Sequence, residues 1–372
     1  MRRRWFDIHR WVGLKLSILL SFVLITGTLA TLSHEIDWLL EPDRRVDPAT
    51  VIGPPHDWAG MYAAARAAYP DWAIVWLSAP EAPWFAAEAV GLTPLGERRR
   101  IYIHPGTLEV QGEGNWVNAQ RILRDSHRRL MIFNTGGIIL VSSLGILLLI
   151  SLVTGLVVYR KFWRGFFRKP RTRDRRTFWG DLHRLGGLWS IWFVFLMGIT
   201  SLYYLVEAAG LRPAPFPVEA REGLSAAADA TAEVPLSAMV ETARAALPGY
   251  RITSIWPPHA AGEPWSFRGQ TDTILVRERA NQIRIDPASG EVVGVVDSEN
   301  LGAWQRVGEA ADPLHFGDFA GFWLKLVYFV FGVILSGMAL SGVYIYSKRI
   351  REAARKAEGR RAPARAMPEA AE

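Results

Sequence analysis

RAAYPDWAIVWLSAP (residues 66–80) aligns without a gap with RAALPGYRITSIWPP (residues 244–258), and this repeated stretch decides the architecture of the chain. The same comparison pairs HRWVGL (residues 9–14) with HRLGGL (residues 183–188). The paired segments follow the same order in the two halves of the chain. The sequence therefore predicts a tandem duplication of one structural unit.

Four apolar runs, two in each copy, are candidates for membrane-spanning helices. They cover residues 11–32, 130–159, 185–206 and 326–346. Each run is about 20 residues or longer and nearly free of charge, which is enough for a helix to cross a hydrocarbon layer roughly 30 Å thick. The first run could also be a cleaved signal peptide, since three arginines precede it. Its partner in the second copy cannot be one, so we predict four membrane spans.

The charge distribution predicts the orientation of these spans. Residues 1–11, 159–184 and 347–372 carry 22 Lys or Arg against 7 Asp or Glu, whereas the connections 33–126 and 207–318 have a net charge of −12. By the positive-inside rule, both termini and the short central loop are cytoplasmic. The basic composition then reflects topology and contact with anionic membrane lipid, and it does not indicate a nucleic-acid partner.

The two long connections each have room for a small α/β domain. In the second connection, residues 236–247 have helical spacing and end at a Pro-Gly pair, and residues 252–256, 273–279 and 282–285 are predicted strands. A hairpin turn follows the last of these strands. The first connection has the same order but replaces the turn Asp286-Pro287 with His104-Pro105. Neither connection contains a paired-carboxylate site, a nucleophile elbow or a glycine-rich phosphate loop, so no catalytic residue is predicted.

The predicted fold is an α-helical membrane bundle of four transmembrane helices with two periplasmic α/β domains, arranged as a tandem parallel repeat of helix, domain and helix. The expected boundaries are helix 1 at residues 1–33, domain 1 at 34–127, helix 2 at 128–160, a basic cytoplasmic loop at 161–182, helix 3 at 183–207, domain 2 at 208–315, helix 4 at 316–346 and a cytoplasmic tail at 347–372.

The chain contains no cysteine. This excludes disulfides, thiolate chemistry, iron–sulfur clusters and covalent attachment of c-type haem. Any redox role must therefore depend on a bound cofactor.

Five of the eight histidines lie close to the predicted spans, where ionisable side chains are rare and often functional. His9 and His183 are equivalent in the repeat and belong to the cytoplasmic face, so they are the natural ligand pair for an inner b-type haem. His127 and His315 form the corresponding pair for an outer haem. His34 has no counterpart and lies 25 residues, or about 37 Å of helix, from His9. It is an alternative or additional outer ligand. Histidines that serve only as interfacial or structural side chains are the competing interpretation.

Cationic side chains near these histidines are candidate partners for haem propionates. They are Arg10, Arg128, Arg184 and Lys325. Arginines that only determine topology would have the same pattern.

Several short motifs identify a resemblance to a known family, the PepSY-associated transmembrane proteins. The motifs are HRWVGL (residues 9–14) and its second copy at 183–188, PGY (248–250), IDPASGEV (285–292), LHFG (314–317), TG (154–155) and SG (341–342). The resemblance implies an inner-membrane protein with two periplasmic PepSY-like domains. Some members resemble di-haem b reductases that release iron from ferric siderophores. His9, His127, His183 and His315 match the family's histidine pattern.

Together these observations predict electron transfer across the membrane, from an inner haem b to an outer haem b and then to a periplasmic acceptor, a ferric chelate or siderophore. Because the chain has no dinucleotide-binding fingerprint, the electrons must come from quinol or a cytoplasmic reductase. The alternative is a non-enzymatic, membrane-anchored binding or regulatory protein of the cell envelope. A transporter is disfavoured because the copies run parallel and no span has a charge-lined midsection.

Overall fold

The computed structural model describes residues 2–15, 17–51, 53, 55–213, 219–220, 234–260 and 262–361. Residues 214–218, 221–233 and 261 of the predicted second domain and 362–372 of the predicted tail lie outside this described part. The chain divides into two compact units. The first, called here the membrane unit, contains residues 1–32, 123–211 and 320–372, and the second, called here the α/β unit, contains residues 33–122 and 212–319.

The membrane unit is helical. Its helices are α1 (Arg2–Lys15), α2 (Ser17–Thr31), the end of α5 (Ala119–Arg129), α6 (Thr135–Val158), η3 (Phe162–Arg164), α7 (Arg175–Trp189), α8 (Ile191–Ala208) and α11 (Phe322–Arg361). Three of them, α6, α8 and α11, are each long and apolar enough to cross a membrane. A fourth span is possible if α1 and α2, which are bent by 65° relative to each other, are counted as one. The chain is therefore a membrane protein with three or four candidate spans in its described part.

Both helices that open a copy are interrupted, whereas the sequence predicted continuous helices at residues 1–33 and 183–207. The first consists of α1 and α2, and the second of α7 and α8, which meet at the buried Ser190. Gly186 and Gly187 lie just before this interruption, and glycine–serine combinations are common causes of helix kinks. Each interruption separates a histidine-bearing helix from the apolar helix that follows it.

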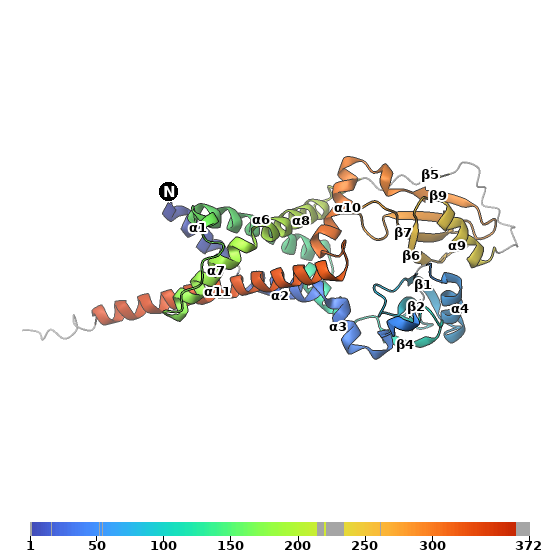
Figure 1. The fold of residues 1–372 in the computed structure, drawn as a ribbon, viewed down its shortest axis with the longest axis horizontal. Helices are drawn as coiled ribbons and strands as arrows, with labels where there is room; N and C mark the ends of the chain where they lie inside the picture. Colours follow the sequence, from blue (N-terminus) through green and yellow to red (C-terminus); the bar gives the residue numbers. More distant parts are fainter. Residues whose placement is uncertain are drawn as a thin grey trace, which may run out of the picture. The chain divides into compact units, whose positions relative to one another are not determined.

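The interruptions allow the two copies to exchange packing partners. Helix α1 packs on α6 of its own copy, whereas α2 packs on α11 of the other copy. Likewise α7 packs on α11 and α8 on α6, as can be followed in Figure 1. Small residues lie at these contacts: a Cβ on Gly198 would be 2.7 Å from Leu149, and one on Gly332 would be 2.7 Å from Thr28. Close helix packing explains these two glycines.

The α/β unit is built from one β-sheet and the helices that precede, follow or connect its strands. Its elements are α3 (Ser33–Leu40), η1 (Pro42–Arg44), η2 (Pro48–Thr50), α4 (Trp58–Ala68), β1 (Ala73–Ser78), β2 (Ala87–Leu92), β3 (Arg98–Ile103), β4 (Val110–Asn115), the start of α5, β5 (Glu219–Ala220), α9 (Leu236–Ala245), β6 (Arg251–Trp256), β7 (Trp265–Gln270), β8 (Asn281–Ile285), β9 (Val292–Val296), η4 (Ser298–Asn300) and α10 (Ala303–Phe316). The predicted helix at residues 236–247 is confirmed as α9, and the predicted hairpin as β8 and β9.

The two copies contribute to one continuous antiparallel sheet, in the order β4-β3-β2-β1-β6-β7-β8-β9-β5. They meet where β1 pairs with β6, with Leu77 opposite Ile255 and Ser78 opposite Ser254. Both of the apolar residues at this junction are fully buried. Helices α4 and α9 pack on the same side of the sheet, and the core of the unit lies between them and the strands.

The strand predicted at residues 273–279 is wrong. The chain is irregular there, Leu275 has a positive φ of 56°, and the strand in question is β7 at Trp265–Gln270. The β-branched residues at 273–279 misled the prediction, because β7 itself has the polar residues Ser266, Arg268 and Gln270 at its alternate positions. Those polar positions face away from the core, while Trp265 and Phe267 face into it.

The unusual first hairpin has a structural explanation. His104 Nδ1 accepts hydrogen bonds from the backbone N–H groups of Gly106 and Thr107, at 3.1 and 3.0 Å. In the second copy Asp286 Oδ1 accepts a bond from the N–H of Ala288 at 3.2 Å. His104 therefore stabilises its turn by accepting backbone hydrogen bonds, as Asp286 does in the equivalent turn of the second copy.

We expect Ile255→Ala to lower the free energy of unfolding of the α/β unit by about 2–5 kcal/mol, because it opens a cavity at the junction of the copies. Thermal unfolding of the full chain, followed by tryptophan fluorescence, measures the effect. Leu95→Ala is the matched control, since Leu95 is 88% exposed. Equal melting temperatures for both variants would contradict the assignment of Ile255 to a rigid core.

Candidate functional site

The rings of His9 and His183 face each other inside the membrane unit. His9 lies on α1 and His183 on α7, the repeat-equivalent helices that precede the two interruptions. Their ring centroids are 6.4 Å apart, and the ring planes are nearly perpendicular, at 84°. The structure thus brings together the pair that the sequence predicted for the inner face.

His183 is oriented by the last helix of its own copy. Its Nδ1 lies 3.1 Å from the backbone carbonyl oxygen of Met338 and 3.2 Å from the hydroxyl of Ser341. A carbonyl only accepts hydrogen bonds, so Nδ1 carries the proton and donates. A neutral imidazole that donates from Nδ1 keeps its lone pair on Nε2, the nitrogen that can bind a metal.

His9 is oriented in the equivalent way by the second helix of the first copy. Its Nδ1 lies 2.9 Å from the hydroxyl oxygen of Thr154. The Thr154 hydroxyl itself donates to the carbonyl of Ile150 at 2.7 Å, so its oxygen is left to accept from Nδ1–H. Again Nε2 is the nitrogen with the lone pair.

A glycine follows each of these hydroxyl residues and lies against the corresponding ring. A Cβ on Gly155 would be 3.6 Å from His9 Cε1, and a Cβ on Gly342 would be 3.7 Å from His183 Cε1. These are ordinary contact distances, so each imidazole rests against helix backbone. The Thr-Gly and Ser-Gly motifs therefore form the wall behind each histidine.

This geometry fits a metal held between two imidazoles. A metal bound by one nitrogen of each ring would hold the centroids roughly 6 Å apart, because a metal–nitrogen bond is about 2 Å and the nitrogen lies about 1 Å from its ring centroid. The other ring nitrogen of a metal ligand usually donates to a carbonyl or similar acceptor, as found here for both residues. Among the described residues, no group of three or more His, Cys, Asp or Glu side chains is placed to hold a metal ion. The pair suits a cofactor that needs only two protein ligands.

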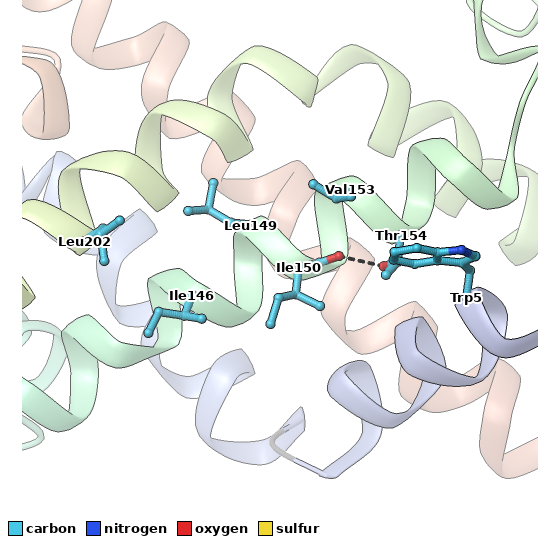
Figure 2. Close-up of a pocket in the computed structure, with 7 residues that line it drawn as sticks. All are labelled: Trp5, Ile146, Leu149, Ile150, Val153, Thr154 and Leu202. Atoms are coloured by element: carbon cyan, nitrogen blue, oxygen red, sulfur yellow. Dashed lines mark hydrogen bonds between the residues drawn. The ribbon is translucent and has the colours of Figure 1, made fainter.

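An open apolar groove of about 310 Å³ adjoins Thr154, the residue that orients His9. Figure 2 shows its lining, with Trp5 of α1 beside Thr154 and aliphatic side chains of α6 and α8 extending from them. Apart from the Thr154 hydroxyl and the indole of Trp5, the side chains that line it are aliphatic.

His127 lies in the last turn of α5 and is anchored to the first copy. Its Nδ1 donates to the backbone carbonyl of Val23 on α2 at 2.9 Å. Gly27 lies one turn further along α2, and a Cβ there would be only 2.5 Å from His127 Cε1. His127 therefore requires a glycine at position 27.

The remaining two predicted ligands belong to the α/β unit. His315 lies near the end of α10 and contacts Phe316 edge-on, with centroids 5.9 Å apart. His34 lies on α3, and its Nδ1 is 2.6 Å from the Glu81 carboxylate. The pairing of His127 with His315, and any ligand role of His34, stay predictions.

Two of the four predicted propionate partners, Arg10 and Arg184, form ion pairs with aspartates in the structure. Arg10 pairs with Asp7 at 3.3 Å, and Arg184 forms an ion pair with Asp181. Arg128 is exposed in the last turn of α5, and Lys325 lies in the first turn of α11. A role in binding propionates stays a prediction for all four residues.

The TG (154–155) and SG (341–342) motifs were noted in the sequence, but no role was predicted for Thr154 or Ser341, which orient the histidines. Thr154 and Ser341 occupy equivalent places in the two copies, as do the histidines that they contact. The duplication could have revealed this correspondence, because a hydroxyl conserved between copies beside a paired histidine is a candidate hydrogen-bond partner.

The model of the family described as "PepSY-associated TM region" matches residues 6–349, nearly the whole chain. The chain belongs to this PepSY-associated family. It is also similar to a protein of Pseudomonas aeruginosa, uncharacterized protein PA4219, with 25% identity over an alignment of 253 residues that covers 61% of this chain. The match spans 63% of that relative's length, just under two thirds.

In this PepSY-associated protein we expect Thr154→Val to weaken metal or cofactor binding at His9 by about 10- to 100-fold, because valine keeps the shape but cannot accept the proton of Nδ1. Cofactor titration of the apoprotein measures the change. Thr31→Val is a matched control, since among the described residues the Thr31 side chain bonds only to the carbonyl of Gly27 in its own helix. Unchanged affinity in the Thr154 variant would contradict the assigned role of the hydroxyl.

Proposed function

We propose that this protein is an inner-membrane oxidoreductase that moves electrons across the membrane through two b-type haems to a periplasmic acceptor. The acceptor is a ferric chelate of the siderophore type, and its reduction releases iron for uptake. The donor is quinol or a cytoplasmic reductase. Both termini are cytoplasmic in this proposal, and the α/β unit, formed by the two PepSY-like repeats, is periplasmic.

One observation carries the proposal: two repeat-equivalent imidazoles lie 6.4 Å apart, and each is held through Nδ1 by the helix beside it. Two histidines that served only as interfacial side chains would have no reason to face each other with the same ring nitrogen anchored. The arrangement supports His9 and His183 as the residues that would hold the inner haem. When bound, haem would supply one-electron transfer without any chemistry of the side chains.

The residues of the chain have three tasks in this proposal. Thr154, Ser341 and the Met338 carbonyl hold the proton of each Nδ1 and keep each Nε2 directed toward the cofactor. The apolar side chains around Thr154 provide an apolar surface next to the residue that orients His9. His127, fixed on Val23, is proposed as a ligand of the outer haem. Its pairing with His315 rests on the repeat alone.

The test is the absorption spectrum of the purified full-length protein. We expect a Soret band and, after addition of dithionite, the bands of reduced b-type haem. The protein in vesicles with a reductant inside should then reduce an external ferric chelate, measured with a ferrous-specific dye. A purified protein without a Soret band, after expression with added haem precursor, would reject the proposal in favour of a non-enzymatic binding protein of the cell envelope.

A further inference from the structure

The two copies differ in charge on the face of the sheet that α4 and α9 leave uncovered. Side chains alternate along each strand, so the neighbours of the core residues Leu77, Ile255, Phe267 and Ile283 face the opposite side. In the second copy these neighbours include Ser254, Arg268, Gln282 and Arg284. Arg268 pairs across the strands with Ser254 and Gln282, and Arg284 lies opposite Ser266.

In the first copy Arg100 on this face, and Arg44 beside it, are paired with carboxylates. The Glu88 carboxylate forms ion pairs with Arg100 and with Arg44, the latter at 2.9 Å. Arg44 is also bonded to Glu41 at 2.8 Å. Both arginines are nearly inaccessible to solvent, so the first copy has a closed network of paired charges.

The second copy lacks the central carboxylate of this network. Since Ile101 and Ile283 are equivalent in the repeat, the strand registers make Ser266 the counterpart of Glu88 and Gln282 the counterpart of Arg100. The same contact exists in both copies, but it is an ion pair in the first and a hydrogen bond from Gln282 to Ser266 in the second. The second copy has instead gained Arg268 and Arg284, where the first has Val90 and Tyr102.

Arg268 is held rigidly. Its Cζ lies 4.2 Å from the ring centroid of Trp256, and Trp256 is stacked on Trp76 with 4.9 Å between centroids and 19° between planes. The Nε of Arg268 is buried without a hydrogen-bond partner among the described residues. Burial lowers the pKa of Arg268, and the charges of Arg279 and Arg284 lower it further. A fixed, partly exposed guanidinium beside two like charges is suited to bind an anion.

We infer that this face, centred on Arg268 and Arg284, binds the anionic oxygen groups of the electron acceptor, so that the preferred acceptor is a negatively charged carboxylate chelate of iron. This inference rests on the proposed function for the identity of the ligand. The anion would lie against the guanidinium groups, while the Ser266 hydroxyl and the Gln282 amide are the nearby neutral groups. The stacked tryptophans keep Arg268 in place before the ligand arrives.

Gallium citrate tests binding without electron transfer, because gallium(III) imitates ferric iron but is not reduced. We expect the full-length protein to bind gallium citrate, and to bind the uncharged gallium acetohydroxamate complex at least about tenfold more weakly. Ser266→Glu places the carboxylate of the first copy into the second, and it should weaken citrate binding roughly tenfold or more. Ser266→Gln has similar bulk without charge and should change the affinity by no more than about threefold. Arg268→Gln should weaken binding as Ser266→Glu does.

Calorimetric titration measures these affinities for the gallium complexes. Absence of gallium citrate binding, equal affinity for the anionic and the uncharged complex, or wild-type affinity in Ser266→Glu would each overturn the inference. Arg66→Gln is the control, since Arg66 lies on α4, on the covered side of the sheet, and bonds only to a backbone carbonyl. A protein that binds gallium citrate but contains no haem would keep this inference and reject the proposed function.

Discussion

Under the proposed function, His183→Ala is expected to remove about half of the b-type haem from the purified protein, because the proposed inner haem would then be bound by His9 alone. The geometry makes this loss specific. The ring centroids of His9 and His183 lie 6.4 Å apart, and each ring is held by a neighbouring helix, His9 by α6 and His183 by α11. His9→Ala should have the same effect, and the double variant should lose no more haem than either single variant.

The measurement is the haem-to-protein ratio from the pyridine haemochrome spectrum. His259→Ala is the matched control, since His259 is an exposed residue of the α/β unit and should retain full occupancy. The surviving haem in His183→Ala should keep an unchanged reduced spectrum. Full occupancy in both single variants would refute the assignment of this pair as ligands. Loss of all haem would show that the two sites do not fill independently.

Gly27→Ala should selectively affect the proposed outer haem site at His127. A Cβ at position 27 would lie 2.5 Å from Cε1 and 2.6 Å from Nδ1 of His127, so the ring must move and its bond to the Val23 carbonyl must break. Since a displacement of the ring misplaces its other nitrogen, we expect the variant to lose the outer haem and to retain the inner one. One added methyl group would then halve the haem content.

The control for this variant is another glycine of a membrane helix. Gly337 on α11 has no atom within 4 Å of the position that a Cβ would occupy, so Gly337→Ala should leave the haem content unchanged. Redox titration should show one midpoint potential in Gly27→Ala and two in Gly337→Ala. Two potentials in both variants would contradict the predicted role of His127.

The elements that depend on local pattern were predictable from the sequence. Apolar runs indicated the membrane helices, and helical spacing ended by Pro-Gly indicated α9. The duplication was sufficient to pair His9 with His183, because equivalent residues in a parallel repeat lie on the same face of the membrane. None of these inferences needs knowledge of how distant segments meet.

What depends on distant contacts was not predictable. The pairing of β1 with β6, which merges the two copies into one sheet, leaves no trace in either strand alone. Strand β7 was missed because its alternate polar residues are weak strand formers that only its burial against the core holds in place. The interruptions of both opening helices accompany an exchange of packing partners between the copies, and a hydropathy pattern does not contain this exchange.

The strand junction and the histidine pair share a geometric property. At the junction Leu77 lies opposite Ile255, its own repeat equivalent, and in the membrane unit His9 faces its own repeat equivalent, His183. Contacts between identical positions are the signature of a two-fold axis, as in a symmetric homodimer. The chain therefore has the form of a dimer whose subunits are fused. In a symmetric homodimer both subunits must have the same residue at equivalent positions. A fused chain encodes each copy separately, so it can have Glu88 in the first copy and Ser266 at the equivalent position of the second. The carboxylate then pairs with arginine in the first copy only, and the arginines of the second copy keep their charge.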